Sequence, residues 1–309
     1  MLPEHIKSIK GLLEYFPTEQ SCIEYLELVR WKNIPVSPFD ENAKVYKCKN
    51  GKYICKNTRK YFTVRNGSVF EKTKIPLRDW FLAIWLMNST KKGVSSLQLM
   101  EHIGVTKSTA WFLGQKIRHL LGMAPEYEDL GIFQLDEAVF GGLNHNRRQD
   151  KKIQNSQGGH TPDKTWVLGM VQYNGEFRAL AMPARSPEFA QLMVRKYIKP
   201  GSAIVTDPWR GYHGLDEYWH FVVKDGQRSH RNNSEIHTNI IEGAWGILKR
   251  GYMGIYNWWS KKYLQHYLNE YVFRYNTRKK KICQRFSLFL EKVFRRIAYK
   301  DIQECKVWN

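Results

Sequence analysis

The chain has 309 residues and a formal net charge of +20, from 49 Lys and Arg against 29 Asp and Glu. A field of this sign concentrates polyanions, which favours nucleic acid as a partner over an anionic membrane or a purely solubilising surface. The 42% of hydrophobic residues argue against a disordered chain, and no apolar stretch approaches the roughly 20 residues of a membrane-spanning helix. Five scattered cysteines argue against a disulfide scaffold and favour a reducing compartment.

Residues 1–76 are expected to form two short helices and then a small β module. Apolar residues recur at helical spacing over Glu4–Phe16 and Thr18–Arg30, and Pro17 separates the two stretches. The pattern then changes to three short β-type runs separated by Asn-Gly turns. These runs are Lys44–Lys47, Lys52–Cys55 and Tyr61–Val64. We therefore place N-terminal helices in residues 1–30 and the β module in residues 31–76.

Residues 77–125 have the pattern of a helix-turn-helix region. Leu77–Met87 is apolar and predicts a helix, and Ser95–Ile103 and Lys107–Leu121 predict two more around a tight turn that starts at Gly104. Side chains and N–H groups at the start of the last helix are in a position to meet phosphate or bases. The candidate DNA-binding residues there are Lys107, Ser108 and Thr109. Two packed helices with no DNA role are the alternative interpretation.

From residue 126 the periodicity changes to that of an α/β domain, which we extend to residue 280. Strands are expected at Gly131–Phe140, Lys164–Gln172 and Glu176–Met182, a helix at Pro187–Ile198, strands at Ser202–Thr206 and His220–Lys224, and a helix at Ile236–Arg250. The first five of these give the order β-β-β-α-β. Lys261–Arg278 and Arg285–Tyr299 are expected to be basic helices, and residues 281–309 form a separate C-terminal basic helical segment.

Positive charge is concentrated in two stretches. Residues 44–74 carry ten Lys or Arg and one acidic residue, Glu71, and residues 243–300 carry fourteen basic residues and two acidic ones. Both stretches interleave aromatic residues with the charge, among them Tyr61, Trp258 and Trp259. This mixture suits phosphate contact combined with stacking on bases, although many of these rings will belong to the core.

Three carboxylates in the second half are candidates for chemistry. Asp136 lies inside a run that otherwise has the character of a buried strand, where a charge needs a partner or a metal ion. Asp207 ends a strand, at the edge where α/β sheets place their ligand sites. Glu242 lies in a helix whose apolar stripe can pack on the sheet. Each residue alone is more simply a turn, cap or surface residue, and only the combination favours a site.

Two Asp on neighbouring strands and a Glu on a covering helix can converge and bind two Mg²⁺ or Mn²⁺ ions through hard oxygen ligands. Two such ions serve phosphoryl transfer, one by lowering the pKa of the attacking water or 3′-hydroxyl and the other by stabilising the leaving oxygen. Because its strand is expected to be central, we assign Asp136 as the bridging ligand.

Three strings around these carboxylates resemble one family. They are Gln134–Gly142 (QLDEAVFGG), Val205–Tyr212 (VTDPWRGY) and His237–Arg250 (HTNIIEGAWGILKR). The strings resemble those of the DDE transposases of the bacterial insertion-sequence 1595 type, with their ISXO-like transposase domain, which are related to the eukaryotic Merlin transposases. Glu270–Asn276 (EYVFRYN) is similar to the C-terminal signature of that family. The resemblance covers roughly residues 20 to 280.

The resemblance implies an RNase H-like (retroviral integrase) catalytic core, preceded by a zinc-ribbon-like β module and a helix-turn-helix. It implies catalytic roles for Asp136, Asp207 and Glu242, with Lys249 about two helical turns after Glu242, contacting the DNA of the transposon end. Asn239 lies three residues before Glu242, and whether it also reaches the metal is left open. Arg250 is assigned to DNA binding together with Lys249.

The family's zinc ribbon has two Cys-x-x-Cys pairs, and this chain departs from them. The matching positions hold Ser37, Asp40, Cys55 and Thr58. Cys55 is the one good ligand that remains, and Cys48 is out of register, whereas a closed zinc site takes four N, S or carboxylate donors. We therefore expect a β module that folds without structural zinc, held by apolar packing.

The main hypothesis is a transposase that binds the terminal inverted repeats of its own element and catalyses strand cleavage and strand transfer. It implies double-stranded DNA as partner, both transposon ends and target, and a homodimer or higher oligomer on that DNA. A transposase-derived DNA-binding protein without catalysis is the alternative, and the lost zinc ligands leave room for it. A junction resolvase is disfavoured, because such a nuclease needs no helix-turn-helix for end recognition.

The expected location follows from this function and from the absence of a hydrophobic signal-peptide block in Met1–Lys10. We expect a cytoplasmic, nucleoid-associated protein if the source is bacterial, and a nuclear one if it is eukaryotic.

Overall fold

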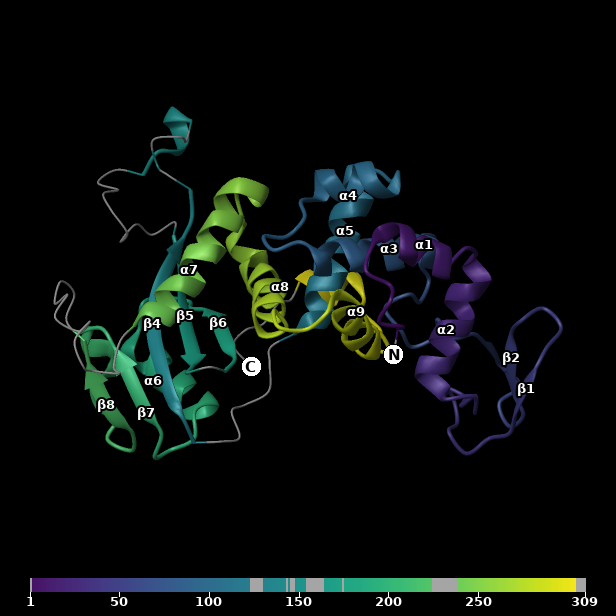
Figure 1. The fold of residues 1–309 in the computed structure, drawn as a ribbon, viewed down its shortest axis with the longest axis horizontal. Helices are drawn as coiled ribbons and strands as arrows, with labels where there is room; N and C mark the ends of the chain where they lie inside the picture. Colours follow the sequence, from purple (N-terminus) through teal and green to yellow (C-terminus); the bar gives the residue numbers. More distant parts are fainter. Residues whose placement is uncertain are drawn as a thin grey trace. The chain divides into compact units, whose positions relative to one another are not determined.

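The computed structural model describes residues 2–122, 130–142, 144, 148–153, 164–173, 175–223 and 238–303 (Figure 1). The chain divides into two compact units. The first, which we call the helical unit, comprises the described residues of Met1–Leu121 and Lys279–Glu304. The second, the sheet unit, comprises the described residues of Gly122–Arg278. The five-part division drawn from the sequence stays a prediction at its finer boundaries.

The helical unit begins with α1 (Ile9–Tyr15) and α2 (Glu19–Trp31). The predicted start of the first helix at Glu4 is wrong, because the Ser8 hydroxyl accepts a hydrogen bond from the Gly11 N–H and caps the helix there. Thr18 and Ser21 form a capping box that starts α2 after Pro17. Both helix starts are therefore set by hydroxyl caps and not by the apolar periodicity.

Three short antiparallel strands form the β module in the order β1-β2-β3, with β1 at Val45–Lys47, β2 at Tyr53–Cys55 and β3 at Tyr61–Phe62. Aromatic rings hold the module against the end of α2. The Trp31 ring lies edge-on to Tyr53 at 5.0 Å, and Tyr53 and Phe62 stack at 5.7 Å. The predicted three-stranded module is confirmed, and its core is aromatic.

The next three helices are α3 (Leu77–Ser89), α4 (Ser96–Ile103) and α5 (Lys107–Leu121). Gly104 ends α4 in the left-handed region at φ 73°, which glycine adopts at no steric cost. The helices predicted on either side of this turn are confirmed as elements. Their DNA-binding role stays a prediction.

The predicted C-terminal helix Arg285–Tyr299 is wrong as a single element. The structure has α9 at Ile282–Glu291 and a separate short α10 at Tyr299–Gln303. Beyond α9 the Val293 carbonyl accepts a hydrogen bond from the Val69 N–H at 2.9 Å, so the backbone pairs with a distant loop instead of continuing the helix. Phe286 of α9 packs on Phe81 and Trp85 of α3, at 5.5 and 5.8 Å between ring centroids.

The sheet unit is built on a mixed five-stranded sheet with strand order β6-β5-β4-β7-β8. The strands are β4 (Ile132–Phe140), β5 (Thr165–Gln172), β6 (Phe177–Ala181), β7 (Ala203–Thr206) and β8 (Trp219–Val222). The β4–β5 and β5–β6 pairs are antiparallel, whereas the β4–β7 and β7–β8 pairs are parallel. The predicted order of elements is confirmed, with β4 at the centre of the sheet.

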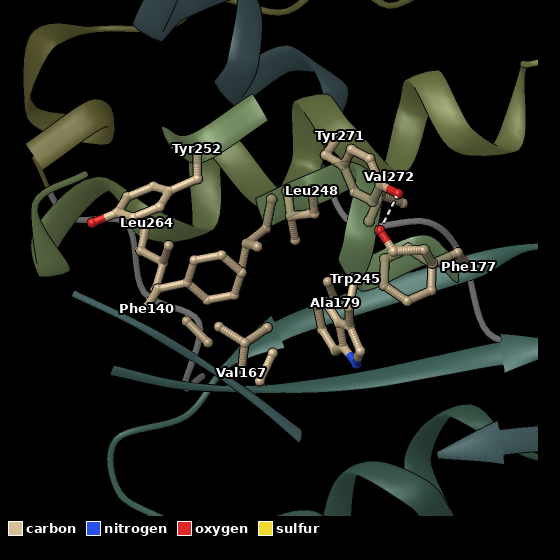
Figure 2. Packing of buried hydrophobic residues seen from close by; sticks show 14 of the residues in the cluster. Phe140, Val167, Phe177, Ala179, Trp245, Leu248, Tyr252, Leu264, Tyr271 and Val272 are labelled. Atoms are coloured by element: carbon tan, nitrogen blue, oxygen red, sulfur yellow. Dashed lines mark hydrogen bonds between the residues drawn. The ribbon is translucent and has the colours of Figure 1, made fainter. Parts of the chain in front are cut away.

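Helices cover both faces of this sheet. One face, the α7 face, packs against α7 (Asn239–Gly251), the π-helical turn Tyr252–Tyr256 that continues it, and α8 (Leu264–Asn276), as Figure 2 shows for Phe140, Trp245 and Tyr271. The other face, the α6 face, packs against α6 (Pro187–Tyr197). The predicted helix over Lys261–Arg278 is a 3₁₀ turn at Lys261–Tyr263 followed by α8. Predicted residues 224 and 236–237 lie outside the described residues.

Two side chains of α8 cover the outer edge of β6. The Asn276 amide pairs with the Phe177 backbone at 2.8 and 3.0 Å, and Gln265 bonds the backbone of Ala179 and Ala181. This edge of the sheet is therefore satisfied within the unit. In the part of the chain that is described, no helix is both long and apolar enough to cross a bilayer.

Candidate active site

Asp136 and Asp207 lie level with each other on adjacent strands. The parallel register pairs Gln134 with Val205, so two residues further along each strand Asp136 stands beside Asp207 at the carboxyl end of β7. The Glu137 N–H donates to Asp136 Oδ1 at 2.8 Å, and the Trp209 N–H donates to Asp207 Oδ1 at 3.1 Å. Both carboxylates are therefore oriented by nearby backbone donors, Asp136 by the next residue of β4 and Asp207 by the loop that follows β7.

Burial and mutual repulsion perturb the first of these carboxylates. Burial, together with the negative charge of Asp207, raises the pKa of Asp136 to about 6. The Glu137 N–H, the Trp245 side chain and the Lys249 charge act in the opposite direction on this pKa. Asp136, Asp207 and Lys249 thus share one electrostatic environment. The strand positions of the two aspartates predicted that they would lie together, whereas Lys249 was expected there from the family resemblance.

The start of α7 is fixed beside Asp136 by a residue that the sequence analysis did not single out. Gln134 lies on the same face of β4 as Asp136, and its Oε1 accepts from the N–H groups of Ile240 and Ile241 at 3.1 and 3.0 Å. These bonds satisfy donors that the Thr238 side chain leaves uncapped. A Gln inside an apolar strand, next to a candidate catalytic residue, was the available signal.

Glu242 does not join the Asp136–Asp207 pair in this structure. It lies in the first turn of α7 with an exposed side chain, and its Oε1 accepts from the Thr238 hydroxyl at 2.7 Å. Asn239 is the first residue of the same helix. Across the described residues, no group of three or more His, Cys, Asp or Glu side chains is placed to hold a metal ion. Glu242, the predicted third carboxylate, therefore lies in the first turn of the predicted helix but is not grouped with Asp136 and Asp207.

A buried network of side chains lies on the α6 face of the sheet, on the side opposite the site. The Glu137 side chain is 2% exposed, accepts from Arg185 Nη2 at 3.0 Å, and accepts the hydroxyl hydrogen of the buried Tyr212. Burial raises the pKa of Glu137 to about 7, against the lowering effect of both donors. Arg185 lies between the rings of Trp166 and Trp209, at 4.7 and 4.5 Å from their centroids.

This network connects the two aspartates through protein groups. Glu137 follows Asp136 on β4, while Trp209, which contacts Arg185 through its ring, binds Asp207 through its backbone N–H. The connection runs from strand β4 through Glu137 and Arg185 to the loop that carries Asp207. We expect it to resist displacement of Asp207, because a buried charged network gains from every satisfied member.

The predicted helix-turn-helix residues lie at the first turn of α5. Lys107 and Ser108 are exposed, and Thr109 is half-buried. The Thr106 hydroxyl contacts the hydroxyls of Ser108 and Thr109 at 3.2 and 2.9 Å, which ties this turn together. Lys107 is the one cationic residue of the three, and it is exposed, as phosphate contact requires.

Three of the four positions that replace the zinc cysteines are linked to one another, and the fourth, Asp40, bonds a neighbour of Cys55 and Thr58 in the chain. The pKa of Cys55 is lowered by hydrogen bonds from the side chains of Ser37 and Thr58, with further contributions from the backbone of Thr58 and Asn57. Asp40 Oδ2 accepts from the Asn57 amide at 2.7 Å. Hydrogen bonds therefore link Ser37, Cys55 and Thr58, three of the positions where the resemblance places zinc ligands, and Asp40 is tied to Asn57 beside them.

The donor set at Asp136 and Asp207 fits a divalent cation. Two carboxylates held side by side supply hard oxygen ligands, and their mutual repulsion, which raises the pKa of Asp136, is relieved by a positive ion. The Glu242 carboxylate accepts a hydrogen bond from the Thr238 hydroxyl that a metal contact can replace. The residues present are thus compatible with the cofactor expected from the sequence.

The sheet unit is a mixed α/β domain, and two aspartates lie level on adjacent strands of its sheet, where they form an acidic centre. This architecture is consistent with an RNase H-like DDE transposase. Residues 130–276 match the family model described as the ISXO2-like transposase domain. The matched segment contains Asp136, Asp207 and Glu242.

One relative is similar over most of the chain. It is a protein of Halobacterium salinarum described as an uncharacterized protein in transposable element ISH50. The two sequences are 24% identical over 278 residues, which cover 85% of this chain and 92% of the relative. The similarity therefore extends beyond the transposase domain into the helical unit.

Proposed function

We propose that this chain is an active DDE transposase, which binds the ends of its own element and catalyses metal-dependent cleavage and transfer of DNA strands. The observation that carries the proposal is the Asp136–Asp207 pair, level on adjacent strands inside an ISXO2-like transposase domain. An RNase H-like core with β4 at its centre accounts for the strand order and for helices on both faces.

In this proposal Asp136 and Asp207 hold divalent cations, with Glu242 as third carboxylate and Asn239 as a further neighbour. When bound, such ions would lower the pKa of the attacking water or 3′-hydroxyl and stabilise the leaving oxygen. The protein's own groups do the orienting. Gln134 holds the start of α7 beside Asp136, and the Glu137–Arg185 contact holds the loop of Asp207.

Basic residues at the end of α7 supply the DNA contacts next to the site. Lys249 and Arg250 are exposed in the last turn of α7, and the charge of Lys249 reaches Asp136. A phosphate near the carboxylates would be neutralised there. Lys107, Ser108 and Thr109 of the helical unit contribute recognition of the element end, and the protein acts as a dimer or larger oligomer.

The second candidate function is a DNA-binding protein without catalysis, and the separation of Glu242 from the aspartate pair favours it. The test uses a plasmid that carries the sequences flanking the gene, incubated with purified protein and Mg²⁺ or Mn²⁺. We expect nicking at the element ends by the wild type, no nicking by Asp136→Asn or Asp207→Asn, and retained end binding by both variants. Wild-type binding without any nicking would favour the second function.

Glu242→Gln separates the two roles proposed for α7. Loss of nicking with retained binding would make Glu242 the third ligand, as the resemblance implies. Unchanged nicking would restrict the metal site to the two aspartates. Glu242 would then keep its hydrogen bond with Thr238 in the active protein.

A further inference from the structure

The turn after α7 displays one tryptophan and buries the next. The Trp258 side chain is 61% exposed, whereas Trp259 is 5% exposed. An indole ring gains more from burial than most side chains, so its exposure on a small turn requires a reason. The two neighbours have opposite environments because the turn directs one of them into the core and the other to solvent.

Backbone hydrogen bonds hold this turn in one shape. The Asn257 N–H donates to the Tyr252 carbonyl at 2.8 Å, and the Trp258 N–H donates to the Tyr256 carbonyl at 2.7 Å. Asn257 itself has φ 59°, in the left-handed region that non-glycine residues adopt at a cost. The display of Trp258 is therefore built into the backbone and does not depend on a flexible loop.

Trp259 anchors the turn to the strand that carries Asp136. Its ring stacks on Tyr267 at 5.1 Å with planes 17° apart, and lies 5.6 Å from Phe140 of β4. Phe140 is four residues beyond Asp136 on the same face of β4, which corresponds to about 13 Å along a strand. The turn that carries Trp258 is thus anchored within a few nucleotides' length of the candidate active site, since each strand of a DNA duplex rises about 3.4 Å per nucleotide.

The segment around Trp258 is positively charged throughout. No acidic residue occurs between Glu242 and Glu270. Four cationic side chains in this interval are exposed, and they are Lys249, Arg250, Lys261 and Lys262. An exposed ring flanked by cations matches a DNA strand, which presents phosphates and base faces together. A protein partner with an apolar patch would not require this charge.

We infer that Trp258 stacks on an unpaired nucleobase of the DNA strand whose phosphates contact the neighbouring Lys and Arg residues. The inference rests on the proposed function, because it assumes a DNA substrate at the sheet unit. It adds a binding subsite for a base outside the duplex, beside the strand end that is cut. A base without a Watson–Crick partner offers both faces, and stacking accepts any base type.

The test compares a single-stranded oligothymidylate with an abasic oligomer of equal length, which has the same phosphates and no bases. We expect Trp258→Ala to weaken oligothymidylate binding about 5- to 150-fold and to leave abasic-oligomer binding unchanged. Trp258→Phe should restore most of the loss, because a benzene ring also stacks. Trp219→Ala is the matched control, since Trp219 is 70% exposed on β8 of the same unit.

Each other outcome has a defined meaning. Equal weakening for both oligomers would assign the effect to charge or folding and overturn the stacking inference. Unchanged binding of both oligomers by Trp258→Ala would also overturn it. A third contrary outcome is a wild type that sediments as a dimer and a Trp258→Ala variant that sediments as a monomer, because the ring would then contact a second copy of the chain. If the wild-type protein binds duplex DNA but binds the two oligomers equally well, the stacking inference is refuted and the proposed function is not. If the wild-type protein binds no DNA at all, the proposed function is refuted.

Discussion

Gly169 provides the space in which the Trp245 ring lies against the sheet. Gly169 is directly opposite Asp136 in the β4–β5 pair, and a Cβ atom at this position would overlap the six-membered ring of Trp245. Figure 2 shows Trp245 reaching from α7 onto the strands, between the rings around it. The absence of a side chain at residue 169 therefore brings an indole next to a candidate catalytic carboxylate.

Gly169→Ala should destabilise the sheet unit by about 1–3 kcal/mol, because the added methyl forces the buried Trp245 ring to move. Urea unfolding followed by tryptophan fluorescence measures the change. Gly243→Ala is the control: residue 243 lies in α7 with open space at its Cβ position, so the substitution should stabilise by up to about 1 kcal/mol. Equal effects at both sites would contradict the proposed contact.

Asp136→Asn should stabilise the protein at neutral pH while abolishing activity. Burial raises the pKa of Asp136 from 3.8 to about 6, so the folded state binds this proton more tightly than the unfolded state. The contribution of this bound proton to the free energy of unfolding is fully present below about pH 4 and is lost as the pH rises through 6. The gain from Asn should therefore be near zero at pH 4 and reach up to about 3 kcal/mol above pH 6.

Thermal unfolding of both proteins across this pH range, in the presence of a chelator, measures the effect. Asp216→Asn, at an exposed carboxyl group of the same unit, controls for the loss of a charge. A stability gain that does not depend on pH would argue against the burial of Asp136 as its cause.

Tyr212→Phe should cost about 1–3 kcal/mol, because it leaves the buried Glu137 carboxylate with one hydrogen-bond donor fewer. A double-mutant cycle with Glu137→Gln should show a coupling energy of at least about 0.5 kcal/mol. Tyr218→Phe, which removes a bond to the neutral Ile198 carbonyl, should cost less. Additive effects of the two network substitutions would show that Tyr212 and Glu137 act independently.

Lys249→Ala should impair end cleavage more than it impairs DNA binding. One phosphate contact is a small part of total affinity, so the slope of log affinity against log salt should fall by about one. Titrations at several salt concentrations, run beside the cleavage assay, check both quantities. Lys199→Ala, at an exposed lysine after α6, should leave cleavage unchanged. A flat salt response of the wild type would reject the DNA-binding function.

The β module should purify without zinc and bind DNA unchanged after Cys55→Ser. The Cys55 thiol is held by hydrogen bonds from Ser37 and Thr58, which a serine hydroxyl can also accept. Elemental analysis of the purified protein measures the metal directly. One zinc per chain, with unfolding of the module by a chelator, would show that Asp40, Cys48 and Cys55 are ligands in an altered arrangement.

Local patterns predicted most of the fold. Periodicity placed the central strands because β4 and β5 are buried and lie between strong turn signals, and it placed Asp136 and Asp207 as charges at strand positions. It failed at Arg285–Tyr299, where a backbone bond from Val69 to Val293 competes with the helix. The apolar spacing of that segment is the same whether it forms one helix or two, so no local signal was present.

The supporting residues of the site are long-range partners, which explains why the sequence did not reveal them. Glu137 meets Arg185 across 48 residues and Tyr212 across 75, and Gln134 meets Ile240 across 106. Helical and strand periodicity relates only residues that are close in the sequence, so it cannot predict contacts over separations of this size. Polar residues inside apolar runs indicated that partners must exist, and only the three-dimensional packing identified them.

The helical unit contains a helix, α9, that is synthesised only after the whole sheet unit. Phe286 of α9 packs between Phe81 and Trp85, and the Leu2 N–H donates to the Ser287 hydroxyl. A ribosome must therefore release all of residues 122–278 before α9 is available to pack against α3. A polypeptide that terminates early, after the sheet unit, would carry every candidate catalytic residue while its α3 lacked this partner. Translation to the end of α9 is thus a condition for completing the helical unit.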